Sequence, residues 1–147
     1  MSEFCGKVSS GLGNASRNLK AGIVETAVAK LLCARRVEAG TLNIELSVEF
    51  KAIDDENYNL YLEPEDYNKR EYVKIKKCKI NGYPSVIVRP ADHFNVEKFK
   101  RRIEIMSSVN LREHLDLSEG EVVRIQCQGD DAWWNGEGSA KPSTACH

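Results

Sequence analysis

The chain has 147 residues, of which 41% are hydrophobic and 29% are charged, and its net charge at pH 7 is −1. This length suits one domain with its own core, and the balanced charge excludes a global field that would recruit nucleic acid or an anionic membrane. The sequence contains no apolar run of transmembrane length and no signal peptide, so we expect a cytoplasmic protein without a membrane partner.

The cysteines give no sign of a disulfide framework or of a zinc site. They are odd in number and scattered, no two form a Cys-x-x-Cys pair, and no histidine lies near them at a ligand spacing. We therefore expect reduced thiols, several of them small core residues. The five are Cys5, Cys33, Cys78, Cys127 and Cys146.

A short strand over residues 4–10 is predicted to lead into a glycine-rich turn. The turn comprises Gly11, Leu12, Gly13, Asn14, Ala15 and Ser16. Because glycine has no Cβ and tolerates positive φ, backbone N–H groups in such a turn can approach an anion closely. The turn is neither a Walker A motif nor a full G-x-G-x-x-G, and structural turns of this composition are common, so both interpretations stay open.

One amphipathic helix is predicted over residues 22–36. Its apolar residues recur at spacings of three and four, as on one face of a helix. Arg35 and Arg36 at its end suit the negative pole of the helix dipole.

A strict polar and apolar alternation over residues 41–50 predicts the central strand. The apolar set shares one face of this strand, and the polar set shares the other. Thr41 and Asn43 therefore point the same way at the start of the strand, where their oxygens can bind one hard cation such as Mg²⁺. The alternative is that both residues are merely the solvent face of a half-buried strand. Phe50 and Val48 are predicted to lie on the apolar face.

The middle of the chain is predicted to form three further strands. Residues 57–62 form a short strand within a polar stretch. Residues 72–80 and 85–89 form a hairpin, because Asn81-Gly82-Tyr83-Pro84 between them carries an Asn-Gly turn signal.

The last part of the chain is predicted to form a strand, a short helix and a final strand, over residues 103–106, 109–115 and 117–125. Several short strands with one main helix indicate a mainly β fold, a small β-barrel with a helix on its side and short helices elsewhere. We expect a barrel domain over residues 1–128 and a disordered C-terminal tail over residues 129–147.

The loop at residues 90–102 contains His93 and a basic cluster. A solvated face is the plainer interpretation of such a cluster, and contact with phosphate or RNA is the alternative. The cluster comprises Lys98, Lys100, Arg101 and Arg102.

Two short motifs in this order resemble the CTP-dependent riboflavin kinases of archaea. They are Gly40-Thr41-Leu42-Asn43 and Val109-Asn110-Leu111-Arg112-Glu113. The glycine-rich turn, the Asn81-Gly82 hairpin and residues 117–125 occur in matching places, so the resemblance covers residues 4–128. It implies a compact six-stranded cradle-loop β-barrel that transfers the terminal phosphate of CTP to riboflavin and releases FMN and CDP.

The resemblance also implies roles for individual residues. Thr41 and Asn43 would be the Mg²⁺ ligands, and Glu104 and His93 would stand at the flavin site. Glu104 is in addition a candidate base for the attacking hydroxyl. The nucleotide site would comprise Gly11, Leu12, Gly13, Asn14, Ala15, Ser16, Val109, Asn110, Leu111 and Arg112. A monomer that binds these small molecules, without a nucleic-acid partner, is expected.

The chain departs from the family pattern at three positions of the expected site. Asn14 and Ala15 replace an acidic residue and a glycine of the nucleotide loop, and His93 replaces a threonine. An alternative function is therefore a non-catalytic nucleotide- or flavin-binding barrel module that has lost phosphotransfer. A third interpretation, a DNA-binding barrel related to swapped-hairpin transcription factors, is disfavoured by the net charge near zero and the single half-repeat.

Overall fold

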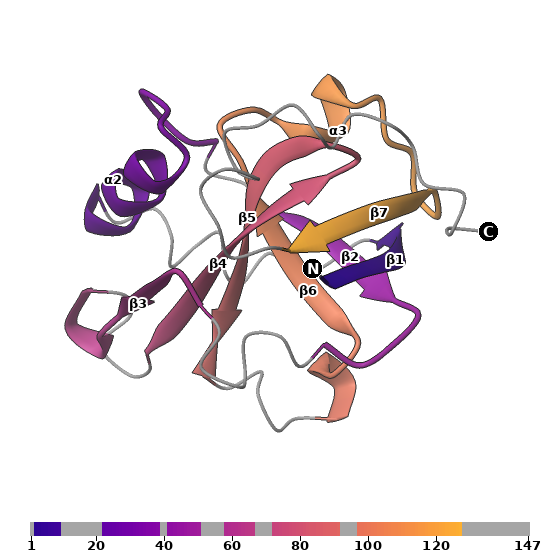
Figure 1. Ribbon diagram of the computed structural model, residues 1–147, viewed down its shortest axis with the longest axis horizontal. Coiled ribbons are helices and arrows are strands. Elements are labelled where there is room, and N and C mark those ends of the chain that lie inside the picture. The colour runs from indigo at the N-terminus through magenta and orange to yellow at the C-terminus, as the bar shows by residue number, and fades with distance from the viewer. Residues whose placement is uncertain are drawn as a thin grey trace.

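The computed structural model describes residues 2–9, 22–38, 41–50, 58–66, 72–91 and 97–127. Within them it contains two α-helices, short 3-10 turns and seven strands (Figure 1). The helices are α2 (Gly22–Leu31) and α3 (Leu111–His114). The strands are β1 (Ser2–Ser9), β2 (Leu42–Leu46), β3 (Leu60–Leu62), β4 (Val73–Ile80), β5 (Tyr83–Pro90), β6 (Arg102–Met106) and β7 (Val122–Cys127). The 3-10 turns are η1 (Pro64–Asp66) and η3 (Glu97–Phe99).

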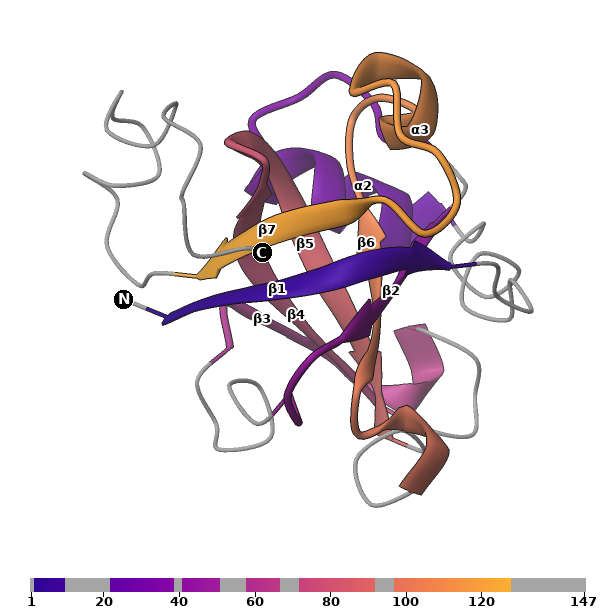
Figure 2. The same ribbon diagram turned by 90° about the vertical axis from the view of Figure 1, so that its right-hand side faces the viewer.

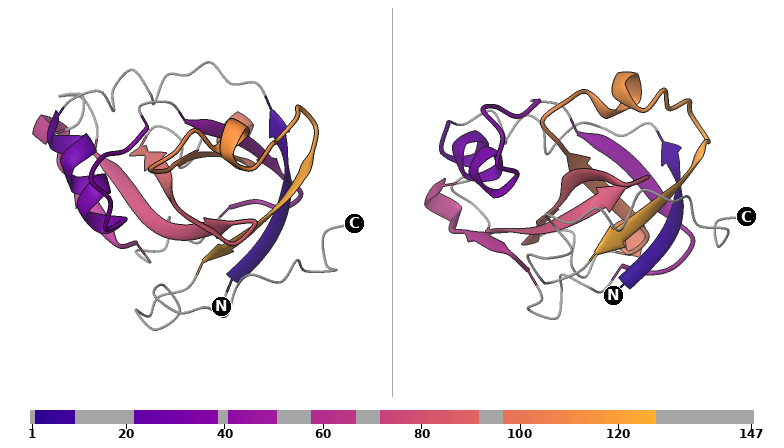
Figure 3. Two further views of the ribbon diagram at one scale, coloured as in Figure 1. Left: turned by 90° about the horizontal axis from the view of Figure 1, so that it is seen from above. Right: turned by 45° about the horizontal axis from the view of Figure 1, so that its top comes forward.

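Six of the strands close into an antiparallel barrel. The strands are hydrogen-bonded in the order β3-β4-β5-β6-β2-β1-β7, and a further pairing between β4 and β7 closes the ring. Strand β3 extends the sheet by pairing with the first half of β4. Figure 2 shows β1 and β7 crossing one side of the barrel, and Figure 3 shows the ring from above. The predicted mainly β, six-stranded barrel with a flanking helix is confirmed.

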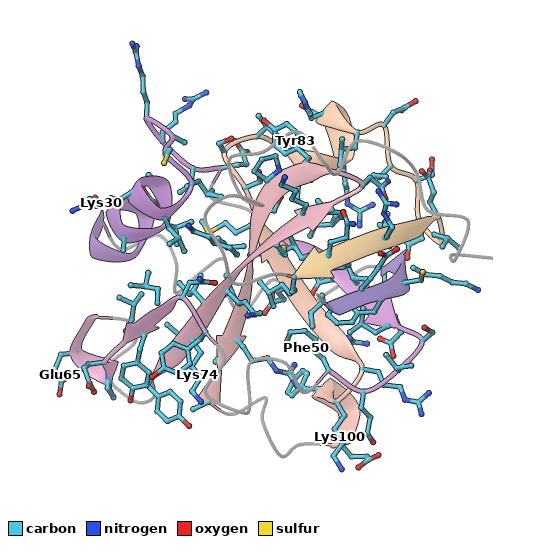
Figure 4. All side chains as sticks on the ribbon, in the orientation of Figure 1. Lys30, Phe50, Glu65, Lys74, Tyr83 and Lys100 are labelled. Atoms are coloured by element: carbon cyan, nitrogen blue, oxygen red, sulfur yellow. The ribbon has the colours of Figure 1, made fainter. Side chains whose placement is uncertain are left out.

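The hairpin between β4 and β5 turns on two residues. Asn81 and Gly82 have φ values of 48° and 84°, which is the geometry of the tight hairpin turn that Asn-Gly favours. Tyr83 and Pro84 were expected in the connection, but they pair with Ile80 and Lys79 and belong to the strand. Figure 4 shows Tyr83 at the α3 end of the barrel, and Phe50 at the other end.

The hydrophobic residues form two clusters, one on each side of the barrel wall. The interior cluster includes Ile44, Ile105 and Ile125, which are fully buried. The second cluster lies on the outer face, where Val28 of α2 packs with Val88 of β5 and other outward-facing residues of β3 to β6. Side chains therefore alternate between the barrel interior and the face that α2 covers, as the period of two requires.

Two predicted elements are shorter than expected. Strand β2 ends at Leu46, because the backbone bends at the next two residues and Phe50 N donates to Lys100 O instead. Val48 is consequently 50% exposed while Phe50 stays buried, so the prediction that they share one face is wrong. Helix α2 ends at Leu31 rather than residue 36, since the backbone at Cys33 is left-handed, with φ 54°.

The prediction that all cysteines are reduced is wrong for Cys5, which is disulfide-bonded. Cys33, Cys78 and Cys127 carry free thiols. Sequence spacing says nothing about the distance between two thiols in the fold, and this distance decides whether a disulfide forms.

The remaining predicted elements occur close to their expected bounds. They are β1 near residues 4–10, β3 within 57–62, β6 near 103–106, α3 within 109–115 and β7, which begins within 117–125 and ends at Cys127. The predicted tail at residues 129–147 lies outside the described residues. No helix in the described parts of the chain is long and apolar enough to cross a membrane.

Candidate functional site

A pocket of about 110 Å³ opens at the α3 end of the barrel. It is lined by Thr41, at the entrance to β2, and by the whole segment Val109–Arg112. Two parts of the predicted site that are far apart in the sequence therefore share one cavity. The cavity is smaller than the few hundred Å³ of most small-molecule sites, so it has room for only part of a ligand as large as a nucleotide.

Segment 109–112 is held in place by a helix cap. Asn110 is the N-cap of α3, and its Oδ1 accepts a hydrogen bond from Glu113 N at 3.2 Å. Asparagine is among the preferred N-cap residues because its side-chain oxygen bonds an N–H that the helix leaves unpaired. The cap fixes the backbone that lines the pocket, and Leu111 is buried beneath it in the interior core.

Arg112 links this segment to the end of β1. Its Nη2 donates a hydrogen bond to Ser9 O at 3.3 Å, across 103 positions of sequence. Ser9 is the last residue of β1. The guanidinium therefore lies where the chain leaves the barrel toward the predicted glycine-rich turn.

Thr41 and Glu104 are joined by a direct hydrogen bond. Thr41 Oγ1 donates to Glu104 Oε1 at 3.0 Å. Glu104 is 5% exposed, although it was expected only to face away from its apolar neighbours. It points away from the barrel interior, because it alternates with the interior residues Ile103 and Ile105.

Asn43 lies beside Glu104 in the sheet. The β2–β6 register pairs Asn43 with Glu104, so the two side chains share one face. Asn43 is 8% exposed, and its predicted solvent-face alternative is therefore wrong: it is a buried polar residue of the barrel wall. Thr41, Asn43 and Glu104 thus form one polar group at the start of β2 and on β6.

These donors fit Mg²⁺ only together with other ligands. Among the described residues, no group of three His, Cys, Asp or Glu side chains could hold a metal ion. Thr41 and Asn43 supply uncharged hard oxygens, and Thr41 keeps its lone pairs while its proton bonds Glu104. Mg²⁺ typically takes one or two protein ligands and completes its shell with water and substrate phosphate, so this pair is compatible with a nucleotide-bound ion.

Four residues that line the pocket were not predicted as site residues: the core residues Leu42 and Ile105, and the polar residues Glu38 and Ser107. Glu38 N donates to Ser107 O at 2.9 Å, and Ser107 Oγ donates to Pro84 O at 2.9 Å. Ser107 therefore ties the chain before Thr41 and the β4–β5 hairpin to the end of β6. Glu38 and Ser107 each lie a few residues before one of the two motifs, and this closeness in sequence could have suggested them as site residues. The hydrogen bond between them could not be predicted, because it forms only when the barrel closes.

Seven predicted site residues lie outside the described parts of the structure. They are Gly11, Leu12, Gly13, Asn14, Ala15, Ser16 and His93. The nucleotide turn and the flavin-site histidine therefore stay predictions.

The basic loop is partly neutralised by carboxylates. Lys100 Nζ lies 3.0 Å from Glu97 Oε2, and Arg102 Nε lies 3.4 Å from Glu45 Oε2. The Glu97 hydrogen bond and charge raise the pKa of Lys100. These pairs favour the solvated-face interpretation over a nucleic-acid patch.

Comparison with known proteins agrees with this fold. A family model described as "Domain of unknown function DUF120", with the short name CTP-dep_RFKase, matches residues 8–127. The riboflavin kinase of Archaeoglobus fulgidus is 32% identical over 93 residues, which cover 59% of this chain and 38% of that protein. The riboflavin kinase of Methanopyrus kandleri is 25% identical over 133 residues, which cover 87% of this chain and 84% of that protein.

The chain thus spans little more than a third of the Archaeoglobus protein but most of the Methanopyrus protein. The family match contains the last two residues of β1, all of β2 to β7 and both helices. This chain therefore belongs to the CTP-dependent riboflavin kinase family.

Proposed function

We propose that this protein transfers the terminal phosphate of CTP to the 5′-hydroxyl of riboflavin and releases FMN and CDP. The observation that carries the proposal is the position of Thr41. It lines the pocket formed with segment 109–112 and at the same time bonds Glu104. A nucleotide held in that pocket would therefore lie beside an acidic residue that can receive the acceptor alcohol.

The nucleotide would be bound by backbone groups at the start of α3 and by the positive charge of Arg112. Capping by Asn110 fixes the backbone at the start of α3, and Arg112 places a guanidinium at the end of β1. Phosphoryl transfer requires mainly positioning and neutralisation of developing charge, and little covalent work by the protein. Arg112 and the predicted turn at residues 11–16 would supply both.

Thr41 and Asn43 would hold Mg²⁺ by their side-chain oxygens. When bound, Mg²⁺ neutralises phosphate charge and orients the phosphate chain. Glu104 holds the Thr41 hydroxyl in a fixed orientation through its hydrogen bond. Outer-shell contacts of this kind set the direction of a metal ligand.

Glu104 would act on the acceptor. A carboxylate has about four lone-pair sites, so the bond from Thr41 leaves capacity to accept the proton of the riboflavin 5′-hydroxyl. That O–H bond breaks as the oxygen forms a bond to the terminal phosphorus, and the bond from phosphorus to the bridging oxygen breaks as CDP leaves. Burial of Glu104 keeps bulk water from this carboxylate.

The test is direct. Purified protein is incubated with riboflavin, Mg²⁺ and either CTP or ATP, and FMN is separated by chromatography. FMN formed with CTP supports the proposal, and the same yield with ATP would overturn the donor assignment. Flavin or nucleotide binding without FMN would favour the non-catalytic barrel module.

A further inference from the structure

We propose that Ser9 is a further nucleotide-binding residue, whose hydroxyl donates a hydrogen bond to an oxygen of the phosphate chain. This proposal rests on the proposed function, because it assigns the nucleotide to the pocket at the α3 end of the barrel. Neither motif that carries the family resemblance contains Ser9.

The sheet register places Ser9 in line with the polar group. Ser9 of β1 pairs with Asn43 of β2, which pairs in turn with Glu104 of β6. Residues directly opposite on antiparallel strands share a face with Cβ atoms about 4.5–5.5 Å apart. The three side chains therefore form one polar row across three adjacent strands.

The Ser9 hydroxyl is shielded from water and has no hydrogen-bond partner among the described residues. Such an atom is uncommon in folded proteins, because a buried hydroxyl without a partner loses its hydration and gains nothing in return. Thr41 and Ser107, the neighbouring hydroxyls of the site, both have partners. A ligand atom at the end of β1 would satisfy the Ser9 hydroxyl.

The position of Ser9 indicates a phosphate rather than the acceptor alcohol. Ser9 lies two strands from Glu104, which is roughly 10 Å at ordinary strand spacing. Ser9 lies instead beside Asn43, a predicted Mg²⁺ ligand. The backbone oxygen of Ser9 accepts a hydrogen bond from Arg112 Nη2. A phosphate attracted by the guanidinium and by the ion would be within reach of the hydroxyl.

The decisive variant is Ser9→Ala, measured by calorimetric titration with CDP and Mg²⁺. We expect the Kd for CDP to be about tenfold higher than that of the wild type, because the variant loses one hydrogen bond to a charged group. We also expect an unchanged or higher Tm, because the variant removes a hydroxyl without a partner. The Kd for riboflavin should not change, since Ser9 lies on the nucleotide side. A purely structural role would lower the Tm and leave the CDP affinity unchanged.

Two further variants complete the test. Ser9→Thr keeps the hydroxyl and should bind CDP within about threefold of the wild type. Ser118→Ala removes an exposed serine before β7 and should behave as the wild type. Equal CDP affinity in Ser9→Ala and the wild type would overturn the role of Ser9 alone, whereas a wild type that binds neither CDP nor CTP would refute the proposed function and this role with it.

Discussion

Thr41 Oγ1 donates a hydrogen bond to Glu104 Oε1 at 3.0 Å, although 63 positions separate the two residues in the chain. Thr41 belongs to the predicted metal pair and lines the pocket proposed for the nucleotide, whereas Glu104 is the predicted contact to the acceptor. The barrel brings the two together because β2 and β6 are neighbouring strands. The residues proposed to bind the nucleotide and the acceptor are therefore joined by one hydrogen bond.

The variant Thr41→Val should abolish Mg²⁺-dependent nucleotide binding while the fold survives. Valine has nearly the shape of threonine but no oxygen for the ion and no proton for Glu104. We expect a loss of about 1 kcal/mol in unfolding free energy from the missing hydrogen bond. Calorimetric titration with CDP and Mg²⁺, beside urea unfolding, measures both effects.

The matched control for this variant is Thr26→Val, which changes an exposed threonine of α2.

Asn43→Leu should lose Mg²⁺-dependent nucleotide binding as Thr41→Val does, since leucine keeps the volume of this buried side chain without its oxygen. Unaltered turnover in Thr41→Val or in Asn43→Leu would contradict the metal assignment.

The variant Glu104→Gln should separate catalysis from binding. Glutamine keeps the acceptor oxygen for Thr41 but is a far weaker base. We expect kcat to fall by roughly 10²- to 10⁴-fold, the usual effect of losing a general base, while KM for riboflavin changes little. Steady-state FMN formation measures both quantities, and a kcat within about threefold of the wild type would exclude a role for Glu104 as base.

The sequence predicted the parts of the fold that depend on local chemistry. The Asn81-Gly82 turn follows from the need for positive φ at both positions, and the buried face of β2 follows from its alternation. The sequence could not predict which residues meet when the barrel closes. The bond from Arg112 to Ser9 and the burial of Glu104 both depend on strand order, which no local pattern contains.

The variant Gly6→Ala should destabilise the barrel at the β1–β2 pairing. A Cβ on Gly6 would lie 2.5 Å from Ile44 Cγ2 and 2.8 Å from Glu45 O. The carbonyl is backbone and cannot retreat without disturbing the register in which Gly6 faces Leu46. We expect a loss of about 1–3 kcal/mol in unfolding free energy, the usual cost of overpacking, measured by urea unfolding.

The neighbouring exposed Lys7 supplies a control, since Lys7→Ala should change the unfolding free energy by less than about 0.5 kcal/mol. A Gly6→Ala protein as stable as this control would show that β1 and β2 can move apart at this point without cost.

The wild type should lose stability as pH rises above 9, because of two buried thiols. Burial raises the pKa of Cys127 from 9.0 to about 12 and that of Cys78 well above 9.0. In the unfolded chain these thiols ionise near pH 9, whereas in the folded protein they keep their protons. Their contribution is therefore complete below pH 9 and is lost as pH rises toward 12, by at most about 1.4 kcal/mol per pH unit for each thiol.

Lys76 acts in the opposite direction. Burial lowers its pKa below 10.5, so the unfolded chain holds this proton longer and Lys76 adds stability as pH rises toward 10.5. Burial lowers the pKa of Lys79 as well. The pKa shifts of the two thiols are the large ones, so the net slope above pH 9 should be downward. Urea unfolding at pH 8, 9 and 10 measures the slope, and Cys127→Ala should make it shallower. A slope that Cys127→Ala leaves unchanged would mean that Cys127 ionises equally in both states, in conflict with its burial in the interior cluster.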